Sequence, residues 1–313
     1  MKLSIVVAVY NEQDNVKPLV EAIHKALDNY SYEIILANDG SSDNTVANIL
    51  QLDDPKVKLV NLRRNFGQSA ALSAGINQAK GEWIVTMDGD LQNDPSDIPM
   101  MLQKAESEHW DVVAGIRAKR KDGVFLRKIP SKIANWIIRK STGLHIKDLG
   151  CALKVFRSEI VKDIGLYGEL HRFIAILAHF EGAKITQVDV KHHARMYGES
   201  KYGINRTFKV MSDLILMVFI KKYLQKPIHL FGTLGFLFFG AGSIINIYLL
   251  FHKLMGNDIG GKPLLMLGIL LTLAGLQFIT VGIITELQMR TYYESQDKRP
   301  YKIKDIWKGS EKL

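Results

Sequence analysis

Two long apolar runs in the last third of the 313-residue chain limit the folds that it can adopt. They cover about 228–251 and 264–285, and neither contains Asp, Glu, Lys or Arg. A helix rises about 1.5 Å per residue, so each run is long enough to cross a hydrocarbon core of about 30 Å. Both faces of each run are apolar, which favours a transmembrane hairpin at 228–286 over a buried helical hairpin of a soluble protein.

The basic residues around these runs predict how the hairpin crosses the membrane. The loop between the runs holds only Lys253 and Lys262, whereas both outer flanks are richer in basic residues: Lys221, Lys222, Lys226, Arg290, Lys298, Arg299, Lys302 and Lys304. Lys and Arg are enriched on the cytoplasmic side of membrane proteins. The early apolar run, 3–9, is too short for a signal-peptide core. We therefore expect an integral membrane protein whose N-terminal part and basic tail, 287–313, both lie in the cytoplasm.

The overall charge indicates an anionic partner but does not identify it. The formal charge is +9, which suits nucleic acid, a phosphate-bearing substrate or an anionic lipid surface. The sequence lacks helix-turn-helix and zinc-ligand patterns and the aromatic-basic interleaving of single-strand binders, so we expect no nucleic-acid partner. A Walker-type loop and a G-x-G-x-x-G motif are also missing. The single Cys151 cannot form an intrachain disulfide.

Residues 1–203 alternate short β-branched runs with helical patterns. The predicted strands are 3–9, 32–37, 57–62, 83–87 and 111–114, and the predicted helices between them are 16–27, 69–80 and 98–108. This alternation predicts an α/β domain with a mostly parallel sheet and helices on both faces. In such a sheet, ligands bind at the carboxyl ends of the strands.

A juxtamembrane segment, 204–227, separates this domain from the hairpin. Its apolar residues share one helical stripe, with basic residues elsewhere: Phe208, Met211, Leu214, Ile215, Val218 and Phe219. This pattern favours an amphipathic helix that lies in the membrane interface. A core-packing helix of the preceding domain is the alternative.

Acidic residues follow the first two predicted strands. Glu12 comes after the first strand and Asp39-Gly40 after the second. Because neighbouring parallel strands end at the same edge, both carboxylates are expected in one cleft beside a tight glycine turn. A carboxylate there can accept hydrogen bonds from a base imide or ribose hydroxyls. An ordinary turn with a helix cap is the alternative for Asp39.

A third acidic cluster follows the fourth predicted strand. Asp88, Asp90 and Gln92 supply hard oxygen ligands of the kind that Mg²⁺ or Mn²⁺ prefers. Such an ion would neutralise charge on a departing nucleoside diphosphate. Most Asp-x-Asp sequences are solvated turns, but this one closes an apolar strand beside two other acidic strand ends.

Basic residues are available to surround an anionic ligand. Arg117 closes the fifth predicted strand, Arg127 and Lys128 follow it, and Arg195, Ser200 and Lys201 come later. Arginine binds phosphate oxygens bidentately, and lysine acts as a point charge. For Lys119, Arg120 and Lys121 we expect solvated surface.

Together, these motifs resemble family 2 glycosyltransferases with a GT-A fold, in particular dolichyl-phosphate mannose synthases and bactoprenol glucosyltransferases. The resemblance covers nearly the whole chain and is carried by seven short motifs in order: residues 9–12, 38–41, 65–67, 88–92, 148–151, 171–173 and 198–202. Two positions depart from it, because Ala8 and Ala175 stand where relatives often have Pro. Neither departure removes a chemical group.

The resemblance implies roles for some of these residues. Nucleoside contacts would come from Ala8, Tyr10, Glu12 and Asp39, and the metal and diphosphate would be held by Asp88, Asp90 and Gln92. Residues near the donor diphosphate or the acceptor phosphate would be Arg117, Arg127, Arg195, Ser200 and Lys201. Asp90 is implied in catalysis, and Asp148 is implied as the general base or an acceptor-orienting carboxylate. A capping or salt-bridging role is the alternative for Asp148.

The resemblance also implies the reaction. The chain would transfer a hexose, glucose being favoured, from a donor of the UDP-glucose or GDP-mannose type to polyprenyl phosphate, with inversion, at a bacterial inner membrane. One alternative is transfer to another lipid or to a growing polysaccharide, although the Gln-x-x-Arg-Trp motif of processive synthases is absent. Another is a non-catalytic membrane subunit that binds a sugar nucleotide. Association through the membrane helices is left open.

Overall fold

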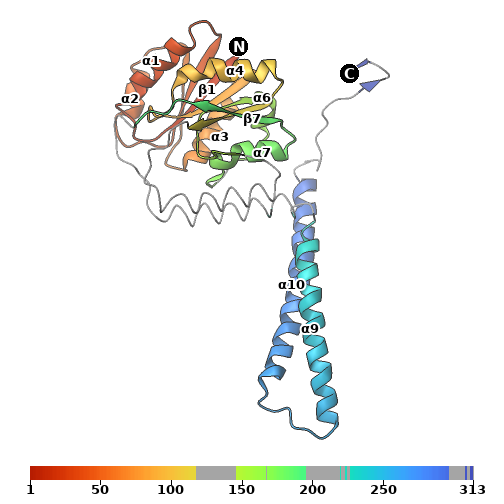
Figure 1. Cartoon of the computed structure of the whole chain (residues 1–313). Helices are drawn as coiled ribbons and strands as arrows, with labels where there is room; N and C mark the ends of the chain where they lie inside the picture. The colour runs from red at the N-terminus through yellow and green to blue at the C-terminus, as the bar shows by residue number, and fades with distance from the viewer. Residues whose placement is uncertain are drawn as a thin grey trace. The chain divides into compact units, whose positions relative to one another are not determined.

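The computed structural model describes residues 1–117, 146–166, 168–194, 219, 223, 226–295, 307–308 and 311–312 (Figure 1). The chain divides into two compact units, residues 1–214 and 215–313. The predicted interfacial segment, 204–227, lies almost entirely outside the described residues, as does most of the predicted tail.

The first unit is built around a mostly parallel sheet. Within the described residues this sheet has seven strands, in the order β3-β2-β1-β4-β6-β5-β7. They are β1 (Leu3–Val9), β2 (Tyr32–Asn38), β3 (Val57–Asn61), β4 (Trp83–Asp88), β5 (Val112–Arg117), β6 (Lys154–Arg157) and β7 (Ile185–Val190). Only β6 runs antiparallel to its neighbours, β4 and β5. The predicted α/β class and the five predicted strands are confirmed, whereas β6 and β7 were not predicted.

Helices cover both faces of the sheet (Figure 1). They are α1 (Val16–Ala26), α2 (Thr45–Leu50), α3 (Gln68–Gln78), α4 (Ile98–Ser107), α6 (Ser158–Lys162) and α7 (Ile174–Phe180), with 3-10 turns η1 (Pro95–Asp97) and η2 (Leu170–Phe173). Helices α1 and α4 pack with one face of β1 and β4 in a common apolar core. Helix α3 packs on the opposite face, against β1 and β2.

Spacing of apolar residues explains this packing. In α1, the buried residues Val16, Leu19, Val20 and Ile23 recur at positions i, i+3, i+4 and i+7, which line one face of a helix. Full burial of each such side chain contributes about 1.5–3 kcal/mol. On the other face, α3 approaches the sheet closely at Gly75, where an added Cβ would lie 2.5 Å from a methyl carbon of Val6.

The second unit contains two long helices, α9 (Ile228–Leu254) and α10 (Pro263–Ser295). The most apolar 18-residue windows of Ile228–Leu254 and Pro263–Met289 have mean hydropathies of 1.9 and 2.3, and most apolar side chains of these helices are exposed. Both helices are therefore long and apolar enough to span a membrane, as predicted. Helix α10 continues ten residues beyond the predicted end at 285.

Glycines let α9 and α10 approach each other closely. An added Cβ at Gly275 would lie 2.3 Å from the backbone nitrogen of Phe239, and one at Gly242 would lie 2.5 Å from that of Thr272. The amide of Asn246 also donates to the Thr272 hydroxyl across the hairpin at 3.1 Å. Small residues at such contacts allow close packing of membrane helices.

We predict that Gly275→Val separates the two helices, because overpacking at the contact costs about 1–3 kcal/mol. The measurement is oxidative cross-linking of cysteines placed at positions 246 and 272 by Asn246→Cys and Thr272→Cys. Gly275→Val should slow this cross-linking. Gly240→Val is the matched control, because an added Cβ at Gly240 meets nothing within 4 Å. Equal cross-linking of the two variants would contradict the proposed close approach.

Candidate active site

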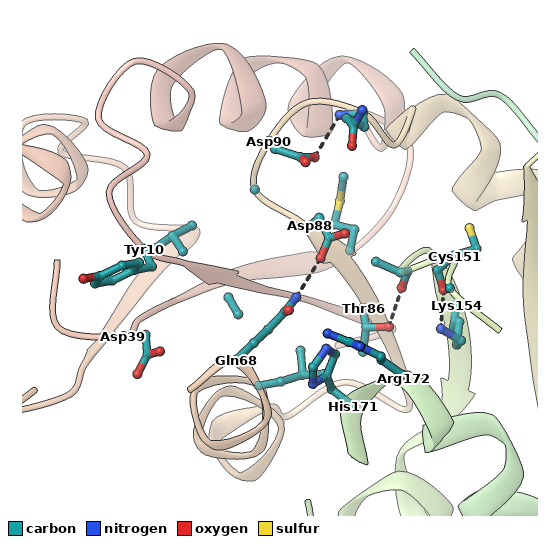
Figure 2. A pocket seen from close by; sticks show the side chains of 18 of the residues that line it. Tyr10, Asp39, Gln68, Thr86, Asp88, Asp90, Cys151, Lys154, His171 and Arg172 are labelled. Carbon is teal, nitrogen blue, oxygen red and sulfur yellow. Dashed lines mark hydrogen bonds between the residues drawn. The ribbon is translucent and has the colours of Figure 1, made fainter. Parts of the chain in front are cut away.

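A cleft of about 840 Å³ opens at the carboxyl ends of the parallel strands (Figure 2). The predicted donor-binding residues that line it are Ala8, Tyr10, Glu12, Asp39, Asp88, Gln92 and Arg117, and Asp90 lines it as well. The sheet register explains their convergence. Ala8 of β1 lies opposite Ala37 of β2 on one side and opposite Asp88 of β4 on the other.

Hydrogen bonds between the first two strand ends hold one wall of the cleft. The backbone N–H of Asn11 donates to the Ser41 hydroxyl at 2.8 Å, and the backbone N–H of Ser42 donates to Asn11 Oδ1 at 2.8 Å. Asn11 has a φ of 53°, a conformation that asparagine adopts more readily than most residues. Glu12 joins the same region because its backbone N–H donates to the Thr45 hydroxyl at 2.8 Å.

Asp39 orders a second loop at the cleft. Its two carboxylate oxygens accept hydrogen bonds from the backbone N–H groups of Phe66, at 2.7 Å, and Gly67, at 3.0 Å. The turn beside it requires glycine, because Gly40 has a φ of 69° and its Cα approaches the Arg64 backbone closely. Asp39 is buried, and each carboxylate oxygen has a second lone pair that remains able to accept a hydrogen bond from a ligand.

Asp88 and Asp90 form a like-charged pair in the middle of the cleft. Desolvation raises the pKa of Asp88 to about 6, and the neighbouring Asp90 carboxylate adds to the rise, while Lys154, Gln68 and Arg117 oppose it. Gln68 donates to Asp88 Oδ1 at 2.9 Å. The described residues contain no group of three or more His, Cys, Asp and Glu placed to hold a metal. The candidate ligands are thus two carboxylates and Gln92, and their repulsion is the kind that a bound cation relieves.

We predict that the raised pKa of Asp88 makes the metal-free protein less stable as the pH rises from about 4 to about 6. In that range the folded state keeps a proton that the unfolded state has lost, so stability is lost as the carboxyl ionises. Asp88→Asn should remove this part of the pH dependence. The measurement is the thermal midpoint against pH in EDTA for both proteins. Parallel curves for wild type and variant would contradict the prediction.

Arg117 and Asp148 form an ion pair at the end of β5. Arg117 Nε lies 2.7 Å from Asp148 Oδ2 and its Nη2 lies 2.9 Å from Oδ1, a bidentate arrangement. The backbone N–H of Gly150 also donates to Asp148 Oδ1 at 3.0 Å. Among the described residues, Arg117 rather than Asp148 contributes to the cleft wall. This geometry matches the salt-bridging role that the sequence left open for Asp148.

Several residues that line the cleft were not predicted to be functional. Gln68 begins α3, Lys154 begins β6, and His171 and Arg172 belong to η2. The motif at 171–173 carried the resemblance and was the available signal for His171 and Arg172, whereas Lys154 stands in a run too short to be predicted as a strand. The predicted residues Arg127, Arg195, Ser200 and Lys201 lie outside the described part of the chain.

Comparison with known proteins identifies the family. The model named glycosyl transferase family 2 matches residues 4–165, about half of the chain. The chain belongs to this family. A dodecaprenyl-phosphate galacturonate synthase of Rhizobium johnstonii is 44% identical over 98% of this chain and 93% of its own length. An undecaprenyl-phosphate 4-deoxy-4-formamido-L-arabinose transferase of Serratia proteamaculans is 34% identical over 97% of this chain and 94% of its own.

The solved structures give the same fold at lower sequence similarity. Glucosyl-3-phosphoglycerate synthase of Mycobacterium tuberculosis, solved with Mn²⁺, UDP and glucosyl-3-phosphoglycerate, superposes with a TM-score of 0.57 and 15% identity. The match covers 70% of this chain and 79% of that chain. The family 2 glycosyltransferase therefore has the GT-A-like sheet that the resemblance predicted.

Proposed function

We propose that this glycosyltransferase moves a sugar from a nucleoside-diphosphate donor to polyprenyl phosphate, with inversion at the anomeric carbon. The observation that supports the donor side is the convergence of Glu12, Asp39, Asp88 and Asp90 in one cleft. Both curated relatives are named as transferases or synthases of polyprenyl-phosphate sugars and match along nearly their full lengths. Membrane-spanning α9 and α10 suit an acceptor that is itself a lipid.

The described residues suggest how the donor is held. Tyr10, Glu12 and Asp39 lie at the ends of β1 and β2, where they suit the nucleoside. Asp88, Asp90 and Gln92 lie at the end of β4, where they would hold Mg²⁺ or Mn²⁺ and the diphosphate. When bound, the ion would neutralise the charge of the departing nucleoside diphosphate. In this proposal, catalysis comes mainly from positioning of the substrates and from charge stabilisation around the leaving group.

In this proposal, Asp148 orients Arg117 toward the cleft. Its two oxygens are occupied by the guanidinium and by the Gly150 amide in the structure. The acceptor phosphate has a second pKa of about 6 and is largely ionised near neutral pH, so a strong base is not required. The general-base role of Asp148 stays a prediction.

The proposal covers a broad class of transferred sugars, both hexoses and pentoses. The sequence favoured glucose, and this preference stays a prediction. Relatives of 44% and 34% identity are named for galacturonate and for 4-deoxy-4-formamido-L-arabinose. The orientation with the catalytic unit in the cytoplasm also stays a proposal, supported by the basic flanks of the hairpin.

We predict that Asp90→Asn lowers sugar transfer by about 100-fold or more, because it removes a charge that the cation needs. Purified protein is incubated in detergent with undecaprenyl phosphate, Mn²⁺ and labelled UDP-sugars and GDP-mannose. Asp94→Asn is the matched control in the same loop, where Asp94 pairs with His193 at 3.0 Å. Unchanged transfer by Asp90→Asn, with normal metal dependence, would refute the metal role. Absence of both transfer and donor hydrolysis in the wild type would favour a non-catalytic binding subunit.

A further inference from the structure

Lys154 is a buried cation in the wall of the cleft. It lies on β6 opposite Thr86 of β4 in the antiparallel register, and both residues line the cleft. Lys154 is buried, with only 3% of the residue exposed to solvent. The ammonium group donates to the backbone carbonyl of Cys151 (Figure 2).

The hydrogen-bond partner of the Lys154 ammonium is a backbone carbonyl, which does not neutralise its charge. No carboxylate oxygen of the described residues lies within the 4.0 Å of Nζ that would make an ion pair. The nearby acids have other partners, because Asp88 accepts from Gln68 and Asp148 accepts from Arg117. An ammonium group has three donors, and burying it is costly unless an anion and further acceptors accompany it. Burial lowers the pKa of Lys154, and an anion in the adjoining cleft would favour the charged ammonium at hydrogen-bonding distance.

Two further basic side chains, Arg172 and His171, line the same cleft. Glu169 Oε2 holds the guanidinium of Arg172 at 2.7 Å. His171 is fixed by Ser69, whose hydroxyl accepts the backbone N–H of His171 at 3.1 Å and lies 2.8 Å from Nδ1. The Ser69 hydroxyl can donate to Nδ1 or accept from it, so the contact fixes the position of the ring in either tautomer. A protonated Nε2 would allow His171 to donate to an anion.

The position of this group separates it from the donor's nucleoside. In Figure 2, Tyr10 and Asp39 lie on one side of Asp88 and Thr86 and Lys154 lie on the other, with His171 and Arg172 below Asp88 and Thr86. If the nucleoside occupies the first side and the diphosphate lies at Asp88 and Asp90, the second side faces the transferred sugar and the acceptor. This step rests on the proposed function.

We propose that Lys154, Arg172 and His171 form an oxyanion subsite that binds an anionic group of a substrate other than the nucleoside diphosphate. The shared chemistry is a carboxylate or phosphate oxygen that accepts hydrogen bonds from all three side chains. Two sources fit: the carboxylate of a uronic-acid sugar on the donor, or the phosphate of the lipid acceptor. Lys154 is the most deeply buried of these three residues.

The test compares anion binding by Lys154→Met with that by Lys154→Arg, which keeps the charge. Calorimetry on the full chain in detergent with Mn²⁺ uses UDP, UDP-glucose, UDP-glucuronate, UDP-galacturonate and farnesyl phosphate. Lys104→Met is the control, because Lys104 lies on α4 and pairs with Glu108 at 2.7 Å. Loss of one charged hydrogen bond should weaken binding about 10- to 100-fold.

The pattern across probes identifies the source of the anion. A loss confined to the uronate donors assigns the subsite to the sugar, and a loss confined to farnesyl phosphate assigns it to the acceptor. Either loss, with UDP binding unchanged and Lys154→Arg close to wild type, supports the proposal. Equal loss for UDP and every other probe, no loss for any probe, or no binding of these anions to the wild type overturns it.

A misfolded Lys154→Met would not end the test. Arg172→Gln, at a residue within the same subsite, should then give the same selective loss, and its absence would count against the proposal. Sugar transfer by the wild type is measured separately with undecaprenyl phosphate. Selective anion binding without transfer would contradict the proposed function while leaving the subsite intact.

Discussion

Repulsion between two carboxylates at the end of the buried strand β4 is the interaction on which the site depends. Asp88 and Asp90 lie two residues apart in a partly desolvated cleft, where the pKa of Asp88 rises to about 6. A sheet tolerates such a pair only if other charges or a ligand compensate. The cations around the pair, Arg117 and Lys154, and the donor Gln68 reduce the repulsion without abolishing it. In the proposed function, a divalent cation that binds with a diphosphate would relieve this repulsion.

The fold supplies this preparation through register and loop contacts. Parallel pairing of β1 with β2 and β4 sets Ala8, Ala37 and Asp88 side by side. Contacts of Asn11 with Ser41 and Ser42, and of Asp39 with the Phe66 and Gly67 amides, then fix the loops that leave those strands. Because each contact joins segments about 30 residues apart, the cleft forms only when the sheet has assembled. The α9–α10 hairpin has its own internal packing, based on glycine contacts between the two helices.

The sequence predicted those parts of the structure that follow from local patterns. Apolar runs bounded by acidic clusters located five strands, and parallel pairing then placed Glu12, Asp39 and Asp88 in one cleft. Strand β6 was missed because it has four residues and begins with Lys154, whose charge interrupts the apolar pattern. Helix α10 continues beyond the predicted apolar run, since Glu286 ends the uncharged run but not the helix. Arg117 and Asp148 lie 31 residues apart in the sequence, so their ion pair could not be inferred from the residues around either one.

Direct detection of the cation tests the central claim most directly. Electron paramagnetic resonance of Mn²⁺ titrated into the purified chain, with and without UDP or GDP, measures how many ions bind and how tightly. The account predicts one ion per chain, bound more tightly when the nucleoside diphosphate is present, and weakened in both Asp88→Asn and Asp90→Asn but not in Asp94→Asn. Mn²⁺ binding that is equal in all four proteins, or unaffected by either nucleotide, would contradict it.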